Sequence, residues 1–211
     1  MKKIFLSTIL AMLSAASMSH AAAERTEQGM AETAWQKKSD EAKTRLDKAS
    51  KALSQDYEKY GMFHPKVAED YKVISEAYFS MGKFDASIEY ALHALKVEMK
   101  LRRENDPQLA KLYFDTGNMY YMHKQHPTAL LYMEKASRIY KNGSDRESTT
   151  LADTYEGIAS VYVNLEDNAK SLLYAQKCLD IRRKRLKKGD DALKRAQMNV
   201  DFLKKELKKE Y

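Results

Sequence analysis

The feature that most limits what this chain can fold into is an internal repeat of 42 residues. Aligned with itself at that offset, without any gap, the sequence matches over three consecutive segments. The matched positions hold the same residue types: Tyr71, Tyr113 and Tyr155; Tyr78, Tyr120 and Tyr162; Tyr90, Tyr132 and Tyr174; Ala94, Ala136 and Cys178; Val97, Ile139 and Ile181. A unit of this size cannot bury its apolar face alone, so neighbouring units must stack on one another.

Each unit is predicted to be a pair of helices. Apolar residues recur three and four positions apart, which is the spacing of one face of a helix. Gly82 in the first unit and His126-Pro127 in the second interrupt that spacing, and Asp106-Pro107 supplies a capping side chain before a proline at a helix start. Only 7 Gly and 3 Pro are present, too few for the turns of a β-sandwich. We therefore predict an all-α fold in which the recurring tyrosines pack the two helices of each hairpin.

The period also sets the predicted domain boundaries. Three full repeats are expected at about 64–105, 106–147 and 148–189, after a degenerate N-terminal repeat at 24–63. Leucine, alanine and valine recur at helical spacing between Leu193 and Leu207, so residues 190–211 are predicted to form an amphipathic capping helix. The same apolar stripe could instead pair two chains as a short coiled coil. A monomer or a weak dimer is therefore expected.

The N-terminus has the pattern of a secretory signal peptide. Lys2 and Lys3 precede a largely apolar stretch from Ile4 to Ala16, and small residues suited to cleavage follow up to Ala23. The alternative, an uncleaved membrane anchor, would require a longer apolar run. We expect residues 1–23 to be removed and the product to be exported, to a bacterial periplasm first of all or else to the medium, where conditions are oxidising.

The order of residue types in each repeat resembles the tetratricopeptide repeat, over about residues 40–190. The first copy reads Tyr71, Ile74, Ser75, Tyr78, Gly82, Phe84, Ser87 and Ala94. The family's usual period is about 34 residues, and the longer period found here resembles that of kinesin light chains. This resemblance implies a right-handed α-solenoid of stacked antiparallel hairpins. It also implies a non-catalytic scaffold whose first helices line a concave groove for a protein or peptide partner.

The resemblance does not extend to a particular partner. Kinesin light chains typically carry an Asn pair on the first helix of each repeat, and the corresponding positions are Lys72-Val73, Phe114-Asp115 and Glu156-Gly157. The clamp that holds the carboxylate tails of chaperones is also unmatched, because Glu76 stands where that clamp has Asn. The identity of the partner cannot be carried over from either group.

The resemblance assigns outward-facing groove positions on each first helix. The predicted groove residues are Lys72, Glu76, Phe79, Phe114, Asn118, Tyr121, Met122, Glu156 and Asn164. Exposed Phe79, Phe114 and Tyr121 beside Met122 would form an apolar patch of the kind that marks binding sites. Asn118 and Asn164 could hydrogen-bond a peptide backbone. The alternative is that one of the rings packs against a neighbouring helix.

A second candidate site is the basic stretch near the C-terminus. Residues 181–211 hold 12 basic and 5 acidic residues, whereas residues 22–180 hold 23 basic and 25 acidic residues. The predicted basic patch consists of Arg182, Arg183, Lys184, Arg185, Lys187 and Lys188. It could hold an acidic partner, an anionic envelope surface or a polyanion, or it could be a solvated helix end. Nucleic acid is not expected, because the stretch lacks interleaved aromatic residues.

No catalytic or metal-binding pattern is found. The histidines lack the His-Glu-x-x-His spacing, and the chain has no glycine-rich phosphate loop or nucleophile elbow. Cys178 replaces an alanine of the other copies and is expected to be a buried, inert thiol, although an exposed thiol could join two chains. We predict neither catalysis nor a cofactor. The leading hypothesis is an exported groove scaffold, and the alternative is an envelope-associated structural protein that binds through its basic C-terminal helices.

Overall fold

The computed structural model describes residues 36–143 and 147–209 of this 211-residue chain. The chain divides into two compact units at the boundary between Thr44 and Arg45. In the first unit, the described residues 36–44 are helical; in the second unit, residues 45–60 are helical and lead into a series of further helices. The expected signal peptide, residues 1–23, lies outside the described residues, so export stays a prediction.

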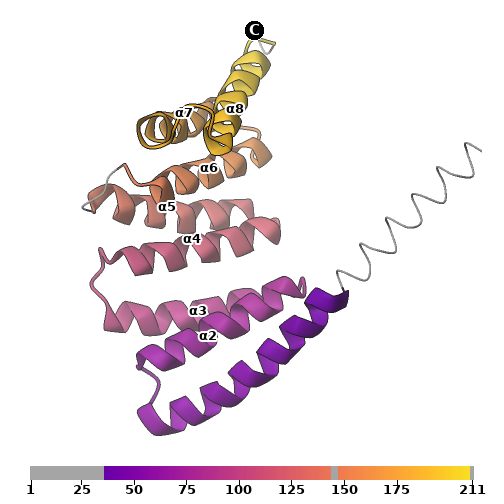
Figure 1. Ribbon diagram of the computed structural model, residues 1–211, viewed down its shortest axis with the longest axis vertical. Coiled ribbons are helices and arrows are strands. Elements are labelled where there is room, and N and C mark those ends of the chain that lie inside the picture. Colours follow the sequence, from indigo (N-terminus) through magenta and orange to yellow (C-terminus); the bar gives the residue numbers. More distant parts are fainter. Residues whose placement is uncertain (1–35, 144–146, 210–211) are drawn as a thin grey trace, which may run out of the picture. The chain divides into compact units, whose positions relative to one another are not determined.

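The second unit continues with seven helices that follow one another in successive layers (Figure 1). Their bounds are α2 (Pro65–Ser80), α3 (Phe84–Leu101), α4 (Pro107–Met122), α5 (His126–Asn142), α6 (Thr149–Asn164), α7 (Asn168–Arg185) and α8 (Asp191–Leu207). Each helix packs against the next along the chain. Among the described residues there is no strand, which confirms the predicted all-α fold of stacked hairpins.

The 42-residue period is exact in the helix starts. The first helices α2, α4 and α6 begin at Pro65, Pro107 and Thr149, and the second helices α3, α5 and α7 begin at Phe84, His126 and Asn168. The helix α8 begins at Asp191, again 42 residues after α6. It is therefore equivalent to the first helix of a fourth repeat, and no second helix follows it within the described residues, which end at 209.

The turn inside each hairpin has the same backbone conformation. One residue takes a positive φ in each turn, and these residues are 42 apart: Gly82 (71°), Lys124 (60°) and Glu166 (59°). The next amide donates to a carbonyl five residues earlier, as in a Schellman motif, for example Gln125 N to Tyr120 O at 2.9 Å. Glycine marks this position only in the first repeat, so the sequence pattern predicted one of the three left-handed residues.

The two helices of each hairpin approach closely at small residues. The facing positions are Ser75 and Ser87 in the first repeat, Gly117 and Ala129 in the second, and Ala159 and Ser171 in the third. The Ser75 hydroxyl donates to the Ser87 carbonyl at 2.7 Å, and the Ser171 hydroxyl donates to the Ala159 carbonyl at 3.0 Å. These buried hydroxyls satisfy their hydrogen-bonding capacity across the helix pair.

A triad of tyrosine rings repeats beside this crossing. In each repeat two tyrosines of the first helix flank one tyrosine of the second, at centroid distances of 5.2–6.2 Å. The triads are Tyr71–Tyr90–Tyr78, Tyr113–Tyr132–Tyr120 and Tyr155–Tyr174–Tyr162. The predicted packing role is confirmed, although several of the rings are only partly buried.

Candidate functional site

The predicted groove positions lie on the first helices α2, α4 and α6, and the repeat period extends them to α8. The positions of Glu156, Ser160 and Val163 on α6 correspond to Met198, Phe202 and Lys205 on α8. We call the set of these positions on α2, α4, α6 and α8 the groove face. Two cavities open on it, one between α2 and α4 and one between α6 and α8.

The cavity between α2 and α4 has a volume of about 310 Å³ and contains four of the predicted groove residues. Lys72, Glu76, Phe79 and Asn118 line it, together with Leu112, Met119 and the pair Lys111–Asp115. Its charges are already paired within the chain: Lys111 Nζ lies 2.6 Å from Asp115, and Arg45 lies 2.9 Å from Glu76. This cavity therefore has an apolar floor and a rim on which acidic and basic groups are balanced.

Two of the predicted groove charges are engaged with the second helix of their own repeat. Lys72 Nζ lies 2.7 Å from Glu69 and 3.3 Å from Glu98, a buried carboxylate on α3. Burial works against the charged form of Lys72, but hydrogen bonds to the two carboxylates outweigh it and raise the pKa of Lys72. Glu156 is held in the same manner by Arg182 of α7, at 2.7 Å. Both residues border the groove face, and the charge of each is matched by a residue of the second helix in the same repeat.

The predicted exposure of the aromatic groove residues is wrong. Phe79, Phe114 and Tyr121 are all partly buried, whereas Met122 is exposed. A Cβ placed on Gly157 of α6 would lie 3.1 Å from the Phe114 ring, so Phe114 fills the space that a side chain would need. The cause is the missing side chain at Gly157, which lets the ring of one repeat pack against the next.

The other two rings also have partners within the chain. Phe79 packs edge-on against Phe84 at a centroid distance of 5.6 Å. The Tyr121 hydroxyl accepts a hydrogen bond from the Asn164 side-chain amide at 3.0 Å, which joins α4 to α6. Asn164 is thus at the surface but already engaged, and Asn118 is the predicted groove amide that lines a cavity.

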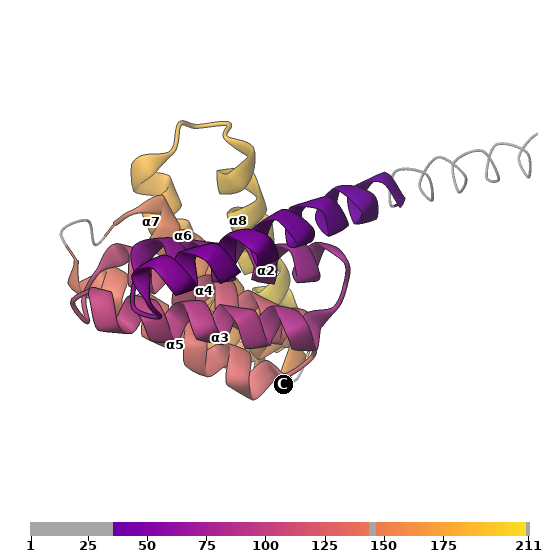
Figure 2. The same ribbon diagram turned by 90° about the horizontal axis from the view of Figure 1, so that it is seen from below.

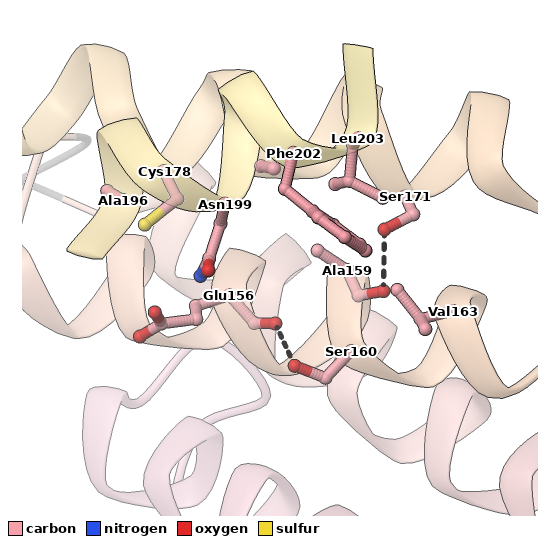
Figure 3. Close-up of a pocket in the computed structure, with 11 residues that line it drawn as sticks. Glu156, Ala159, Ser160, Val163, Ser171, Cys178, Ala196, Asn199, Phe202 and Leu203 are labelled. Atoms are coloured by element: carbon pink, nitrogen blue, oxygen red, sulfur yellow. Dashed lines mark hydrogen bonds between the residues drawn. The ribbon is translucent and has the colours of Figure 1, made fainter. Parts of the chain in front are cut away.

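The cavity between α6 and α8 was not anticipated from the sequence. It has a volume of about 210 Å³, and Figure 3 shows the Phe202 ring extending from α8 toward Ala159 of α6. Its lining also includes Ser160, Val163, Asn199 and Leu203. Phe202 is 60% exposed and Met198 68% exposed, although both are large and apolar. The signal that could have identified them was present, because Met198 lies one period after Glu156 and Phe202 two periods after Asn118, both predicted groove positions.

Cys178 lies among the residues that line this cavity. Its side chain is buried, as predicted, and burial raises the pKa of the thiol to about 12. A thiol that stays protonated at neutral pH is a poor nucleophile, so Cys178 acts as a small apolar residue between α7 and its neighbours.

The basic patch is not a single exposed surface. Arg182 is only 3% exposed and binds Glu156 at 2.7 Å, Asp153 at 2.8 Å and the Ala192 carbonyl at 3.3 Å. Burial opposes its charge, but the hydrogen bonds to Glu156 and Asp153 more than compensate and raise the pKa of Arg182. Its assignment to the patch is therefore wrong, because the helix turns this position toward α6 and α8.

The remaining residues of the predicted patch are all exposed but differ in their pairing. Lys184 pairs with Glu147, whose carbonyl also accepts from Arg185 at 3.0 Å, and Arg183 donates to Gln197 at 2.5 Å. Lys187 and Lys188 are exposed in the segment between α7 and α8. An exposed basic surface remains here, but several of its charges are already matched within the chain.

The part of the chain that the structure describes contains no group of three or more His, Cys, Asp or Glu side chains arranged to hold a metal ion. The His123 Nε2 atom instead lies 3.0 Å from the Asp85 carboxylate, and the His123 ring is tilted against Phe84 at a centroid distance of 6.1 Å. None of the described helices is long and apolar enough to cross a membrane.

Comparison with known families and structures agrees with this geometry. Two family models described as tetratricopeptide repeat match residues 70–142 and 151–191. No curated protein matches the sequence. Similar solved structures include a kinesin light chain-like protein with nearly identical TPR-like repeats from Podosopora anserina, at 12% identity and a TM-score of 0.66, covering 80% of this chain and 84% of that one.

Two further solved structures share the fold. BtubC (BKLC) from P. vanneervenii is 16% identical with a TM-score of 0.61, and the match covers 82% of this chain and 84% of that one. The apo form of RapI is 20% identical with a TM-score of 0.68, and the match covers 81% of this chain but 45% of that one. At these identities the similarity establishes the fold alone.

Proposed function

This chain belongs to the tetratricopeptide-repeat family, and we propose that it is an exported, non-catalytic scaffold that binds a protein or peptide partner along its groove face. The observation that carries the proposal is the pair of cavities at equivalent places on that face, between α2 and α4 and between α6 and α8. Surface cavities lined by apolar groups with a few polar ones are where partner side chains are bound most strongly.

The groove face is better suited to this role than the opposite face of the repeats. On the second helices α5 and α7, Leu131 and Leu173 are exposed singly, at equivalent positions, and line neither cavity. A further cavity beside the exposed Met99 is lined by residues of α3 alone, whereas each groove cavity is formed by three helices. Isolated exposed leucines are normal for a folded protein, whereas apolar residues around a cavity indicate a contact site. The proposed binding surface is therefore the first-helix face.

Site-specific photo-crosslinking in cells distinguishes the two faces. A photoreactive amino acid replaces Val163 or Met198 on the groove face, and Leu131 or Leu173 on the second helices as exposed controls. A further groove variant carries it at the partly buried Asn118. We expect one discrete adduct from the groove positions and none from the controls. Adducts that form only at the control positions would contradict the groove scaffold.

The basic stretch supplies the competing function, attachment to an anionic envelope surface. Exposed residues such as Lys187 and Lys188 would then make the contact, and the protein would sediment with envelope material at low salt and be released at high salt. If binding responds in this way and is indifferent to groove-face substitutions, the function lies in the basic segment instead.

Export is tested separately by fractionating bacteria that express the full chain. We expect the product in the periplasm or medium, with a new N-terminus near Ala22–Glu24 in mass spectrometry. A cytoplasmic product that retains Lys2 and Lys3 would refute the exported location without affecting the groove.

A further inference from the structure

The helix α8 exposes apolar residues on one side only, and that side is the groove face. Its buried side, Ala196, Val200 and Leu203, packs on the repeats. The positions where the other repeats place tyrosines against a second helix hold Gln197 and Lys204 on α8, which are polar. The side of α8 that corresponds to those tyrosines is thus polar and suited to water. The exposed apolar residues Met198 and Phe202 are therefore confined to the groove-face side of α8.

The cavity beside Phe202 has the size of one large side chain. Its volume of about 210 Å³ is below the roughly 300–1,000 Å³ of most small-molecule sites. It exceeds the roughly 150 Å³ of a dry cavity known to admit benzene. The Phe202 ring and Val163 border it, with Ala159 and Leu203 deeper in the lining. It suits an aromatic or branched aliphatic side chain entering from the groove face.

Unmatched positive charge flanks this cavity along α8. Arg195 lies one turn before Met198 and Lys205 one turn after Phe202, and within the described chain neither forms an ion pair or hydrogen bond. The carboxylates on the same side are neutralised: Asp191 by Lys194 at 2.9 Å, and Glu206 by Lys209 at 2.6 Å.

Beneath the cavity, Glu156 is held by Arg182 at 2.7 Å. Arg182 is shared with Asp153, so this group on the α6 and α7 side keeps one negative charge. The unmatched positive charge therefore lies on the α8 side of the apolar centre. A surface of this kind attracts and orients an acidic ligand.

We propose that this cavity binds an acidic segment of the partner, which inserts one large apolar side chain beside Phe202 and places carboxylates against Arg195 and Lys205. The inference rests on the proposed function and names the chemistry of the partner at one end of the groove face. A second copy of this chain is a poorer occupant, because residues 191–209 hold six basic and three acidic residues and two such helices would repel each other.

The test is selection from a displayed library of random short peptides on the purified protein. We expect enriched peptides to combine Asp or Glu with Trp, Phe, Leu or Ile. A synthetic copy of the strongest peptide is then titrated by fluorescence anisotropy against matched variants, each first shown to be folded by circular dichroism and thermal unfolding. Because Phe202 and both basic residues are exposed, their substitution should leave the fold intact.

Phe202→Ser and the pair Arg195→Glu with Lys205→Glu should each weaken binding by about tenfold or more. The control pair Lys204→Glu with Lys208→Glu makes the same change in net charge on the other side of α8, and should alter affinity by less than about twofold. The loss of affinity caused by substituting Arg195 and Lys205 should shrink as the salt concentration is raised. The loss caused by Phe202→Ser should persist.

Four other outcomes would overturn the inference. Enriched peptides that are neutral or basic would refute the charge argument. Peptides that still bind Phe202→Ser but no longer bind Asn118→Ala would move the site to the cavity between α2 and α4 and leave the scaffold function intact. A dimer in analytical ultracentrifugation that Phe202→Ser abolishes would make the occupant a second copy. No enrichment, together with no groove-face crosslink, would refute both proposals.

Discussion

At the scale of single residues, Gly117 lies where α4 packs closely against the backbone of α5. A Cβ added there would lie 2.7 Å from Met133 Cγ, 3.2 Å from the Ala129 carbonyl oxygen and 3.3 Å from the Met133 amide nitrogen. The side chain of Met133 can move, but the backbone of α5 cannot withdraw without opening the hairpin. Glycine is thus required in the second repeat by packing, although it lowers helix propensity by about 1 kcal/mol relative to alanine.

Gly117→Ala should therefore destabilise the protein in spite of the better helix former. We expect a loss of about 1–3 kcal/mol in the free energy of unfolding, measured by urea denaturation, because the added methyl overpacks the crossing. Gly157→Ala is the matched control, since its nearest neighbours at 3.1 and 3.2 Å are the Phe114 ring and the Met133 sulfur, which are ends of side chains. An equal loss in both variants would show that backbone crowding is not the cause.

Tyr140 is a buried tyrosine whose acidity is strongly perturbed. Burial raises its pKa from 10.0 to about 12, with a smaller contribution from the charge of Asp115. The folded state thus binds this proton more tightly than the unfolded chain does. The resulting stabilisation is complete below about pH 10 and is lost as the pH rises through about 12.

Tyr140→Phe should therefore flatten the fall of stability with alkaline pH. Urea midpoints of the two proteins, compared between neutral pH and the highest pH at which the chain stays folded, give the measurement. A phenolate titration by ultraviolet absorbance should also lose its last-titrating group. Identical slopes for both proteins would mean that Tyr140 ionises as freely in the folded state as in the unfolded one.

At the scale of elements, each second helix has a buried residue with a titratable side chain in its last turn, at the same repeat position. These residues are Glu98 on α3, Tyr140 on α5 and Arg182 on α7. In the first repeat Lys72 lies between Glu69 and Glu98, and in the third Arg182 lies against Asp153 and Glu156. The first and third repeats thus use the same positions with the charges exchanged between helices, and each pairing joins the two helices of a hairpin.

Reversing the charge of Arg182 should destabilise the hairpin of the third repeat. Reversing the charge of Glu156 as well should restore its stability. Removing a partner from a buried pair costs about 3–5 kcal/mol, but Asp153 is 53% exposed and Glu156 33%, so we expect at least about 2 kcal/mol for Arg182→Glu. Adding Glu156→Lys recreates the arrangement of the first repeat and should restore more than half of the loss. Chemical denaturation measures the free energy of unfolding of both variants. A double variant that is no more stable than Arg182→Glu alone would contradict the pairing.

At the scale of the whole second unit, the core is unevenly distributed. One large apolar cluster runs from Ala94 to Leu203 and takes in residues of α3 to α8. A second, small cluster of Ile88, Ala91 and Met119 joins α3 to α4. Helix 45–60 contributes to neither cluster. Because each repeat contacts only its neighbours, stability in such a stack follows the local burial.

Hydrogen exchange should therefore be slowest in α4 to α6 and fastest in helix 45–60, where Ala49 is the one buried residue. Exchange followed by mass spectrometry measures the order directly. Deleting α8 should speed exchange in α7 most, because it uncovers the side on which Ala196, Val200 and Leu203 are packed. Uniform protection across the second unit would instead mean that it unfolds as one cooperative body.

The 42-residue period was enough to predict the helices, their pairing and the stacking of the repeats. Recurring small residues and tyrosines mark where two helices meet, because a repeated contact requires the same residue types at each repeat. The outward positions of the first helices came from the resemblance to the tetratricopeptide repeat, and the period relates them from one repeat to the next. Extended by one step, it would also have pointed to Met198 and Phe202.

The tertiary structure decided which of those positions are available to a partner. Phe114 is partly covered because Gly157 of the next repeat has no side chain, and Lys72 and Glu156 are neutralised by Glu98 and Arg182 on second helices. Arg182 belongs by sequence to a basic run, yet it is buried because the helix turns it toward α6 and α8. The exposure and ion pairing of these residues depend on neighbours that are distant along the chain. A local sequence pattern therefore cannot predict them.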